Sequence, residues 1–217
     1  MVILPLEKKL KKRMHKTIAL VQDLLVMEIY DSFSSAVIHG GTAIWRCYGS
    51  NRFSEDVDFY FPPRLKKARF EDLQTSLKGK GFSILKFKKT ENSIFAKFSN
   101  LNAVVRLEVL FKGVKDFVTK DFEMSDGTSI LVNTLKPEEM VKEKISAYLK
   151  RRKTRDLYDI FYLVKSVEDK EKVRDELADF LKKFRKPADE REFKALIISG
   201  SIPKPGEMLG AIQRWVR

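Results

Sequence analysis

Few of the residues that build covalent or zinc-linked scaffolds occur in this sequence. Of its 217 residues, one is cysteine, Cys47, and two are histidine, His15 and His39. A single thiol cannot form an intrachain disulfide, so we expect the chain to work in a reducing compartment. One cysteine and two histidines also cannot supply the four ligands of a structural zinc site, which excludes that class of protein.

Long apolar runs are missing as well. The apolar stretch at residues 1–6 is shorter than the hydrophobic region of a signal peptide. No run approaches the roughly 20 apolar residues of a membrane-spanning helix. We therefore expect a cytoplasmic location and no membrane partner.

Positive charge dominates among the charged residues. Lys and Arg number 43 against 30 Asp and Glu, which gives a formal net charge of +13. Such a surplus favours polyanionic partners such as RNA, DNA or nucleotide phosphates. A Lys-rich, solvated surface would explain the same surplus equally well. Hydrophobic residues make up 43% of the chain, which is enough for a packed core.

Hydrophobic periodicity predicts helices and strands together in the first part of the chain. Apolar residues recur at helical spacing over residues 6–30, and Val57, Phe59 and Phe61 alternate with other residues in the period-two pattern of a strand. The other expected elements are strands at 36–39, 82–87, 93–98 and 103–111, helices at 42–48 and 64–77, and edge strands at 116–122 and 129–132.

After Thr134 the pattern becomes helical. Pro137, Glu138 and Glu139 suit the first turn of a helix. Helices are expected over residues 137–151, 155–165, 169–184, 189–198 and 206–215. The sequence therefore predicts an α+β protein, with a mixed-sheet domain at residues 1–134 and an all-helical domain at residues 135–217.

Two glycines and two aspartates form the pattern that carries chemistry. A predicted strand runs into Gly40 and Gly41, and a predicted helix begins at once. Glycine lets the backbone approach a ligand closely, and the N–H groups of a helix start attract phosphate. Further along, Asp56 and Asp58 stand two residues apart on a predicted strand, so both carboxylates project from one face. Adjacent carboxylates are costly unless a cation lies between them, and oxygen ligands suit Mg²⁺.

The order of these residues resembles the nucleotide-binding motif of the DNA polymerase beta superfamily of nucleotidyltransferases. Within it, the string Arg-Phe-Ser-Glu-Asp-Val-Asp-Phe at residues 52–59 is similar to the AbiEii/AbiGii toxin family. That family contains toxins of abortive-infection toxin–antitoxin systems and related enzymes that add nucleotides to transfer RNA. The resemblance covers about residues 36–165 and implies a polymerase-beta-like core. It also implies nucleotide-binding roles for Gly40, Gly41, Thr42, Arg52 and Ser54.

Enzymes of this kind need a third carboxylate on a neighbouring strand, and Glu108 is the best candidate. It is a charged residue in the otherwise apolar stretch 103–111, a local conflict of the type that is often functional. The resemblance implies that Asp56, Asp58 and Glu108 are catalytic and hold Mg²⁺ or Mn²⁺. The alternative is that Glu108 pairs with Arg106, two residues away on the same face.

A second motif lies in the helical part. Lys144 and Arg151 are seven residues apart and therefore share one helix face. With the following Arg-Asp-x-x-Asp, they resemble the later motif of the same family. The resemblance implies a catalytic Lys144 that contacts the triphosphate, a nucleotide-binding Arg151, and Asp156 and Asp159 that face the nucleotide or brace the basic side chains. Alternatively, both aspartates form ordinary i,i+4 pairs with arginines.

The function implied by the resemblance is Mg²⁺-dependent transfer of a nucleoside monophosphate from a nucleoside triphosphate to an acceptor hydroxyl. RNA, such as the 3′ end of tRNA, is the expected acceptor, and the basic residues between Lys142 and Arg155, with Arg64, Lys66 and Lys67, are its expected surface. The expected role is that of a toxin, for which a cognate antitoxin would be a further partner. The alternatives are a protein nucleotidylyltransferase and a catalytically silent nucleic-acid-binding module of the same fold.

Overall fold

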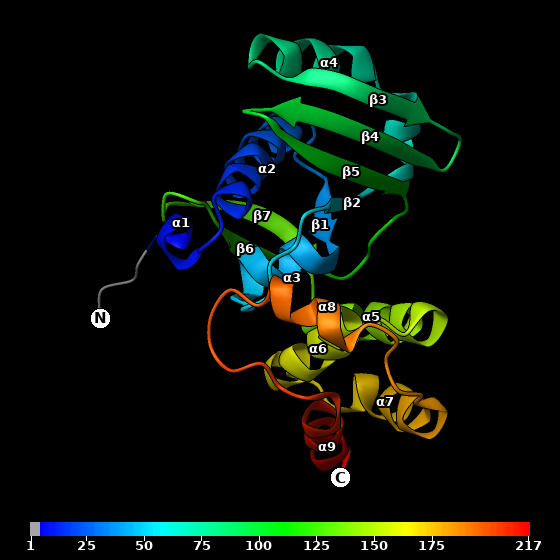
Figure 1. The fold of residues 1–217 in the computed structure, drawn as a ribbon. Helices are drawn as coiled ribbons and strands as arrows, with labels where there is room; N and C mark the ends of the chain where they lie inside the picture. The colour runs from blue at the N-terminus through cyan, green and yellow to red at the C-terminus, as the bar shows by residue number, and fades with distance from the viewer. Residues whose placement is uncertain (1–4) are drawn as a thin grey trace. The chain divides into compact units, whose positions relative to one another are not determined.

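The chain forms two compact units in a computed structural model that describes residues 5–217 (Figure 1). The sheet unit comprises the residues up to 47 together with 53–134, and the helical unit comprises residues 48–52 and 135–217. Residues 1–4, which belong to the short apolar stretch at the N-terminus, lie outside the described residues.

A seven-stranded mixed sheet is the centre of the sheet unit, with strand order β3-β4-β5-β2-β1-β7-β6. The strands are β1 (Val37–His39), β2 (Val57–Phe61), β3 (Ser83–Lys89), β4 (Ser93–Asn100), β5 (Ala103–Phe111), β6 (Phe117–Glu123) and β7 (Ser129–Leu135). β2 pairs with β5, and β1 with β7, in parallel, whereas β1–β2, β3–β4 and β4–β5 are antiparallel. The predicted mixed sheet and the α+β class are confirmed.

One predicted edge strand is an interior strand. β6 lies at the edge, but β7 lies between β1 and β6. Ile38 and Thr134 are partners in the parallel β1–β7 pair, and the Thr134 hydroxyl donates a hydrogen bond of 2.8 Å to the backbone oxygen of Ile38. A partner strand so far away in the chain leaves no local signal, so the sequence pattern alone did not reveal this position.

The helix predicted over residues 6–30 is wrong as a single element. It divides into α1 (Leu6–Lys9) and α2 (Arg13–Ser32), because Leu10 adopts an extended conformation at φ −82° and ψ 121°. The N–H of Glu7 donates to the backbone oxygen of Ser125 at 2.9 Å, which ties α1 to the turn between β6 and β7. The cluster of adjacent lysines around Leu10 also disfavours a continuous helix through mutual repulsion.

Helices cover one face of the sheet. The remaining helical elements of this unit are α3 (Gly40–Tyr48), the 3₁₀ helix η1 (Pro63–Lys67) and α4 (Phe70–Gly79). The ring of Tyr30 on α2 lies 5.7 Å from that of Phe59, and Phe70 on α4 lies 6.3 Å from Phe61. Phe59 and Phe61 are fully or almost fully buried, so α2 and α4 form the core with this face.

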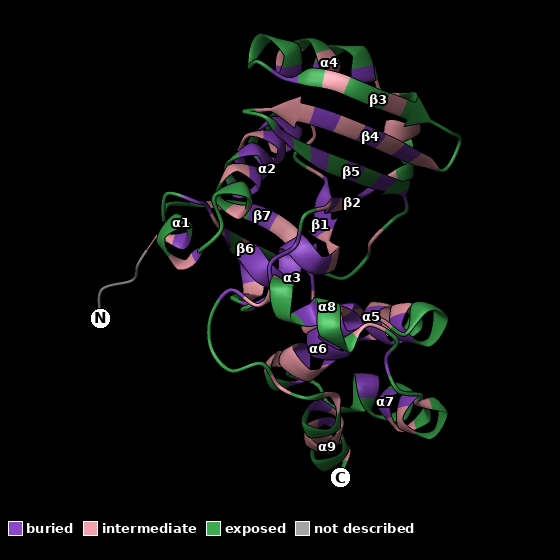
Figure 2. Cartoon of the chain, viewed as in Figure 1, coloured by how far each residue is buried: buried purple, intermediate pink, exposed green. Residues whose placement is uncertain are grey.

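The opposite face of the sheet is accessible. Along β5, buried residues alternate with exposed ones, and Val104, Arg106, Glu108 and Leu110 all lie on the exposed side (Figure 2). We call this side the exposed face of the sheet. Asp58 shares it, because its neighbours Val57 and Phe59 point into the core.

The helical unit has helices at all five predicted places. They are α5 (Pro137–Arg151), α6 (Thr154–Leu163) with the 3₁₀ turn η2 (Val164–Ser166), α7 (Glu171–Lys183), the short α8 (Glu190–Phe193) with η3 (Lys194–Leu196), and α9 (Pro205–Val216). Tyr148 is central to this unit, and its ring packs against Phe180 at 5.5 Å and Phe184 at 5.6 Å. Among the described helices, none is long and apolar enough to cross a membrane.

Residues 48–52 belong to the helical unit although they connect α3 to β2. The Tyr162 hydroxyl donates to the backbone oxygen of Tyr48 at 3.0 Å. The N–H of Ile198 donates to the oxygen of Asn51 at 2.8 Å. The turn inside the first motif is therefore held by α6, which carries part of the second motif, and by the segment that follows η3.

Candidate active site

Asp58 and Glu108 lie side by side on the exposed face. They are directly opposite partners in the parallel pair of β2 and β5, where neighbouring strands are about 4.8 Å apart. Two carboxylates held this close repel each other unless a proton or a cation shares the space. The structure thus brings together two of the three carboxylates predicted from the sequence.

Gly40 makes room for the Asp58 side chain. Its φ of +74° lies in the left-handed region, and a Cβ built on it would overlap the Asp58 carboxylate, with the Asp58 Cγ only 3.0 Å away. Only glycine combines this backbone conformation with this absence of a side chain. The turn at Gly40 and the Asp58 carboxylate are therefore in direct contact, and Gly41 follows, buried in the first turn of α3.

Hydrogen bonds fix the loop that carries Asp56. The Thr42 hydroxyl, on α3, donates to the backbone oxygen of Asp56. The side-chain amide of Gln22, on α2, donates to the backbone oxygens of Ser54 at 2.9 Å and Glu55 at 3.0 Å. Thr42 and Gln22 are fully buried, so both predicted motif segments are anchored to the core. The sequence did not single out Gln22. The one feature that could have identified it is that a polar residue stands among the apolar residues of the α2 helix.

Arg106 holds the remaining predicted carboxylate. Its Nε and Nη2 donate to the two oxygens of Asp56 at 2.6 and 2.5 Å. Hydrogen bonding to Asp56 raises the pKa of Arg106, and the charge of Glu108 adds to that effect. The Arg106 side chain is 45% exposed, so this pair is reachable from solvent. Sequence analysis had considered Arg106 only as a partner of Glu108.

His39 lies next to Asp58, at the end of β1. It is the cross-strand partner of Asp58 in the antiparallel pair of β1 and β2. Its ring stacks on Tyr60, with centroids 3.8 Å apart, and the Lys112 ammonium lies 4.6 Å from the Tyr60 ring. His39 therefore packs through its ring at the end of β1, beside the carboxylate pair.

The carboxylate set suits a hard divalent cation. Asp58 and Glu108 present oxygen donors from adjacent strands to one side, which is the donor chemistry that Mg²⁺ and Mn²⁺ prefer. Asp56 is bound by Arg106, so it can join such a site only if the guanidinium withdraws. Among residues 5–217, no three Asp, Glu, His or Cys side chains are already grouped as metal ligands. Metal binding by these residues therefore stays a prediction.

A buried network of charges occupies the helical unit. Asp159 accepts hydrogen bonds from Arg52 Nε at 2.8 Å on Oδ1 and from Nη2 at 2.9 Å on Oδ2, and the Lys144 ammonium lies 2.7 Å from Oδ2. Asp156 receives two hydrogen bonds of 2.7 Å from Arg151 and lies 3.7 Å from Lys144. Both aspartates are fully buried, unlike the surface pairs of the alternative expectation.

The basic side chains in this network determine the ionisation of Asp159. Burial alone would raise its pKa, but the charges of Arg52 and Lys144 and their hydrogen bonds outweigh burial, so the pKa is lowered. The aspartates thus brace Arg52, Lys144 and Arg151 within the helical unit. Contact of these residues with a nucleotide stays a prediction.

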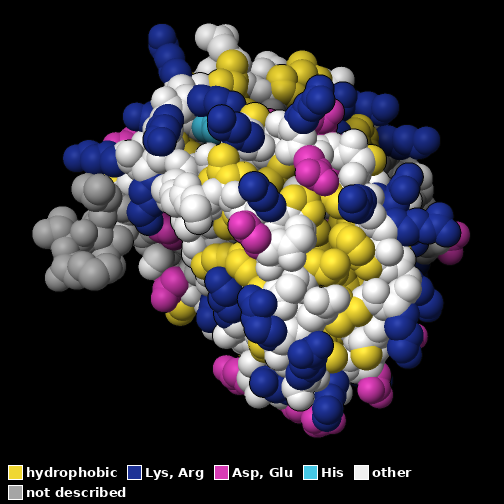
Figure 3. Space-filling view, turned by 60° about the horizontal axis from the view of Figure 1, so that its bottom comes forward, with side chains coloured by type: hydrophobic (Ala, Val, Ile, Leu, Met, Phe, Trp, Pro, Cys, Tyr) yellow, Lys and Arg dark blue, Asp and Glu magenta, His cyan; other side chains and the backbone are white. Residues whose placement is uncertain are grey.

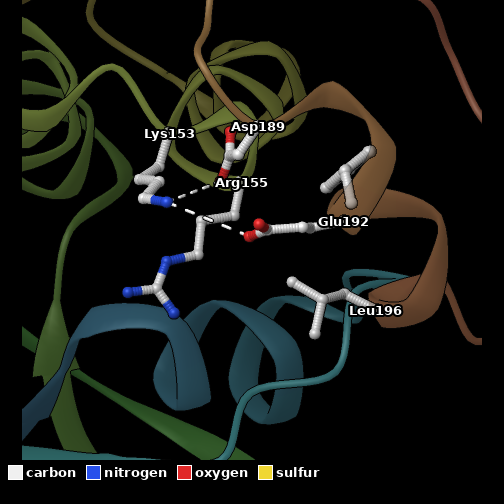
Figure 4. Close-up of a pocket in the computed structure, with 6 residues that line it drawn as sticks. Lys153, Arg155, Asp189, Glu192 and Leu196 are labelled. Carbon is white, nitrogen blue, oxygen red and sulfur yellow. Dashed lines mark ion pairs between the residues drawn. The ribbon is translucent and has the colours of Figure 1, made fainter.

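Ion pairs also take up much of the basic segment expected to bind RNA. Lys142 lies 3.2 Å from Glu139, and Lys153 lies 3.4 Å from Asp189. A cavity of about 200 Å³ beside Lys153 is lined by Lys153, Arg155, Asp189, Glu192, Phe193 and Leu196 (Figure 4). Asp189 also accepts hydrogen bonds from the backbone N–H of Thr154 at 2.7 Å and its hydroxyl at 2.9 Å. This cavity is therefore built around the anchored start of α6.

Several solved structures share the fold, among them MenT4 and JHP933. MenT4, a nucleotidyltransferase toxin from Mycobacterium tuberculosis H37Rv, matches 92% of this chain and 82% of its own at 15% identity, with a TM-score of 0.63. JHP933 from Helicobacter pylori matches 91% of this chain and 90% of its own at 21% identity, with a TM-score of 0.60. At such low identity the likeness shows the fold alone.

The fold and the family match together define a nucleotidyltransferase. Residues 23–205 match the family described as "Nucleotidyl transferase AbiEii toxin, Type IV TA system". Since the match covers most of the 217 residues, the chain belongs to the AbiEii family of nucleotidyltransferase toxins. No curated protein matches the sequence.

Proposed function

We propose that the chain transfers a nucleoside monophosphate from a nucleoside triphosphate to a terminal hydroxyl of RNA, such as the 3′ end of tRNA, in the cytoplasm. The observation that carries this proposal is the directly opposed pair of Asp58 and Glu108, in contact with the turn at Gly40. Membership of the AbiEii family supports the reaction class and a toxin role, for which a cognate antitoxin would be a partner.

Each group of the proposed site in the sheet unit would have its own role in the reaction. The backbone N–H groups at Gly41 and Thr42, at the start of α3, would bind the triphosphate. Glu108 would accept the proton of the acceptor hydroxyl, whose oxygen then bonds to the α-phosphorus. The bond between that phosphorus and the β-phosphate oxygen breaks, and pyrophosphate leaves. Asp58 and Glu108, with Asp56, would hold Mg²⁺ or Mn²⁺, which when bound stabilises negative charge on the transferred group.

The helical unit contributes the predicted cations of the second motif. Lys144 and Arg151 would neutralise the triphosphate, and Asp156 and Asp159 would orient them. The buried carboxylates support this proposal, because Asp156 and Asp159 place two counter-charges beside the Lys144 ammonium at a position that is only 10% exposed. Arg52 and Ser54 would also contribute to nucleotide binding, and the hydrogen bond that anchors the Arg52 guanidinium on Asp159 supports this role for Arg52.

Labelling of total RNA and total protein tests the proposal. The full chain is incubated with both extracts and each of the four α-³²P-labelled nucleoside triphosphates, with Mg²⁺ or with a chelator. We expect label in RNA only, and only when the divalent cation is present. Label in protein would instead establish a protein nucleotidylyltransferase. Absence of label in both polymers would contradict the proposed reaction and favour a silent nucleic-acid-binding module.

A further inference from the structure

Three cations stand directly opposite one another across β3, β4 and β5. Lys86 is the cross-strand partner of Lys97, and Lys97 is the partner of Arg106. Like charges in direct opposition destabilise a sheet, so packing within the fold does not explain this row. Arg106 is bound to Asp56, whereas Lys86 and Lys97 form no ion pair within residues 5–217.

A second row connects the carboxylate pair to an aromatic ring. Across five strands, the directly opposed residues are His39, Asp58, Glu108, Phe95 and Lys88. Phe95 is thus the immediate neighbour of Glu108 on β4, about 4.8 Å away in the strand spacing. Phe95 is partly exposed, and the Lys86 ammonium lies 5.2 Å from its ring centroid.

Lys and Arg occur along the whole chain, but among the described residues some of these side chains already contact a carboxylate or an amide of the protein, and others do not. On the face drawn in Figure 3, Lys and Arg side chains are numerous, with fewer Asp and Glu between them. Lys142 and Lys153 of the helical unit are already paired with carboxylates, and Lys66 donates a hydrogen bond of 2.9 Å to Asn92. The lysines on β3 and β4 are therefore better placed to bind an external polyanion.

We infer that β3 and β4 bind the single-stranded 3′ end of the acceptor RNA on the exposed face. Lys86 and Lys97 bind backbone phosphates, the terminal base stacks on Phe95, and its ribose hydroxyl lies next to Glu108. This inference rests on the proposed function and adds the surface that positions the acceptor. An aromatic ring flanked by cations suits an unpaired nucleotide, because every base has a face that can stack. A protein hydroxyl would need neither the ring nor the row of lysines.

RNA binding without nucleotide tests the surface independently of catalysis. A 5′-fluorescent RNA hairpin with an unpaired 3′ end is titrated with the full chain at several salt concentrations, and anisotropy is recorded. Lys86→Gln/Lys97→Gln should reduce the slope of log affinity against log salt by about 1.4, since single strands contribute about 0.7 per phosphate contact. Phe95→Ala should weaken binding roughly five- to a hundredfold with little change in slope, and Phe95→Tyr should restore it.

A matched pair of lysines on the other side of the sheet is the control. Lys16 on α2 and Lys78 on α4 are exposed and belong to the helices that cover the core face. Lys16→Gln/Lys78→Gln removes the same charge and should leave the salt slope near that of the wild type. Thermal unfolding should show both double variants folded, because Lys86→Gln/Lys97→Gln removes a repulsion. Equal salt slopes for the two double variants would overturn the inference.

Transfer assays separate this inference from the proposed function. If the wild type labels RNA and Lys86→Gln/Lys97→Gln raises only KM for RNA, both stand. If that variant keeps the wild-type KM for RNA, the assignment of β3 and β4 as the RNA-binding surface is contradicted, and the proposed function is not affected. If RNA binds through these lysines but no polymer is labelled, the surface stands and the proposed reaction fails. Label in protein, with no RNA binding, would overturn both.

Discussion

Arg106 donates two hydrogen bonds to Asp56, of 2.6 and 2.5 Å, one to each carboxylate oxygen. Arg106 lies on β5, on the face that also carries Asp58 and Glu108, and Asp56 lies on the loop just before β2. A guanidinium in this position neutralises the same carboxylate that a divalent cation would use. We therefore expect Arg106 and a divalent cation to compete for Asp56.

Removal of Arg106 should therefore tighten the binding of divalent cations. Arg106→Gln frees Asp56, and because the pair is partly exposed we expect about a three- to tenfold lower dissociation constant for Mn²⁺. Mn²⁺ titration followed by electron paramagnetic resonance measures this without nucleotide or RNA. Lys78→Gln, which removes a charge from α4, serves as the control. Unchanged or weaker Mn²⁺ binding by Arg106→Gln would show that Asp56 is not a metal ligand.

Gly40 should tolerate no side chain. Gly40→Ala places a Cβ in the space of the Asp58 carboxylate, and we expect transfer to fall about a hundredfold through misplacement of Asp58. Gly81→Ala is the matched control, because Gly81 also has a positive φ, +83°, but its added Cβ would meet only Asn100 Nδ2 at 3.8 Å. Both variants carry left-handed strain of about 1–2 kcal/mol. Equal transfer rates for the two variants would argue against a role for the Gly40–Asp58 contact.

The buried network should make the helical unit sensitive to acid. The pKa of Asp159 is lowered from its ordinary value of 3.8, because Arg52 and Lys144 outweigh the effect of burial. The stabilisation is therefore complete above that value and is lost as the pH falls through the still lower pKa of the folded state. Wild-type stability should drop steeply below about pH 4.

Asp159→Asn should flatten this acid dependence. At neutral pH it should cost about 3–5 kcal/mol of unfolding free energy, since Arg52 and Lys144 stay buried without that counter-charge. Urea unfolding at a series of pH values measures both effects. Asp179→Asn is the control, because Asp179 pairs with Lys182 on the surface, where ion pairs contribute little. An acid dependence of Asp159→Asn as steep as that of the wild type would contradict this role.

Strand alternation made part of the site predictable from the sequence. Val57 and Phe59 flank Asp58, so its carboxylate was expected on one face of a strand, whereas Glu108 was singled out as a charged residue in an otherwise apolar stretch. That these two strands are neighbours came from the family resemblance. The structure then showed the direct opposition of Asp58 and Glu108 through the parallel pairing of β2 with β5.

Partners distant in the chain could not be predicted in this way. Arg106 stands close to more than one carboxylate, and only the three-dimensional path of the loop before β2 selects Asp56. Lys144 was expected to contact the triphosphate, yet in the structure it contacts two buried aspartates of the following helix. The contact of α1 with the turn at Ser125 joins residues distant in the chain, which local helical periodicity does not reveal.

Transfer of labelled nucleotide to RNA by Asp58→Asn and Glu108→Gln tests the central claim most directly. Each substitution keeps the side-chain shape and removes one of two adjacent charges, so stability should be equal or higher. We expect each variant to be about a hundredfold to ten-thousandfold slower than the wild type at saturating nucleotide and RNA. If either variant transfers nucleotide at the wild-type rate, this carboxylate pair is not the catalytic centre.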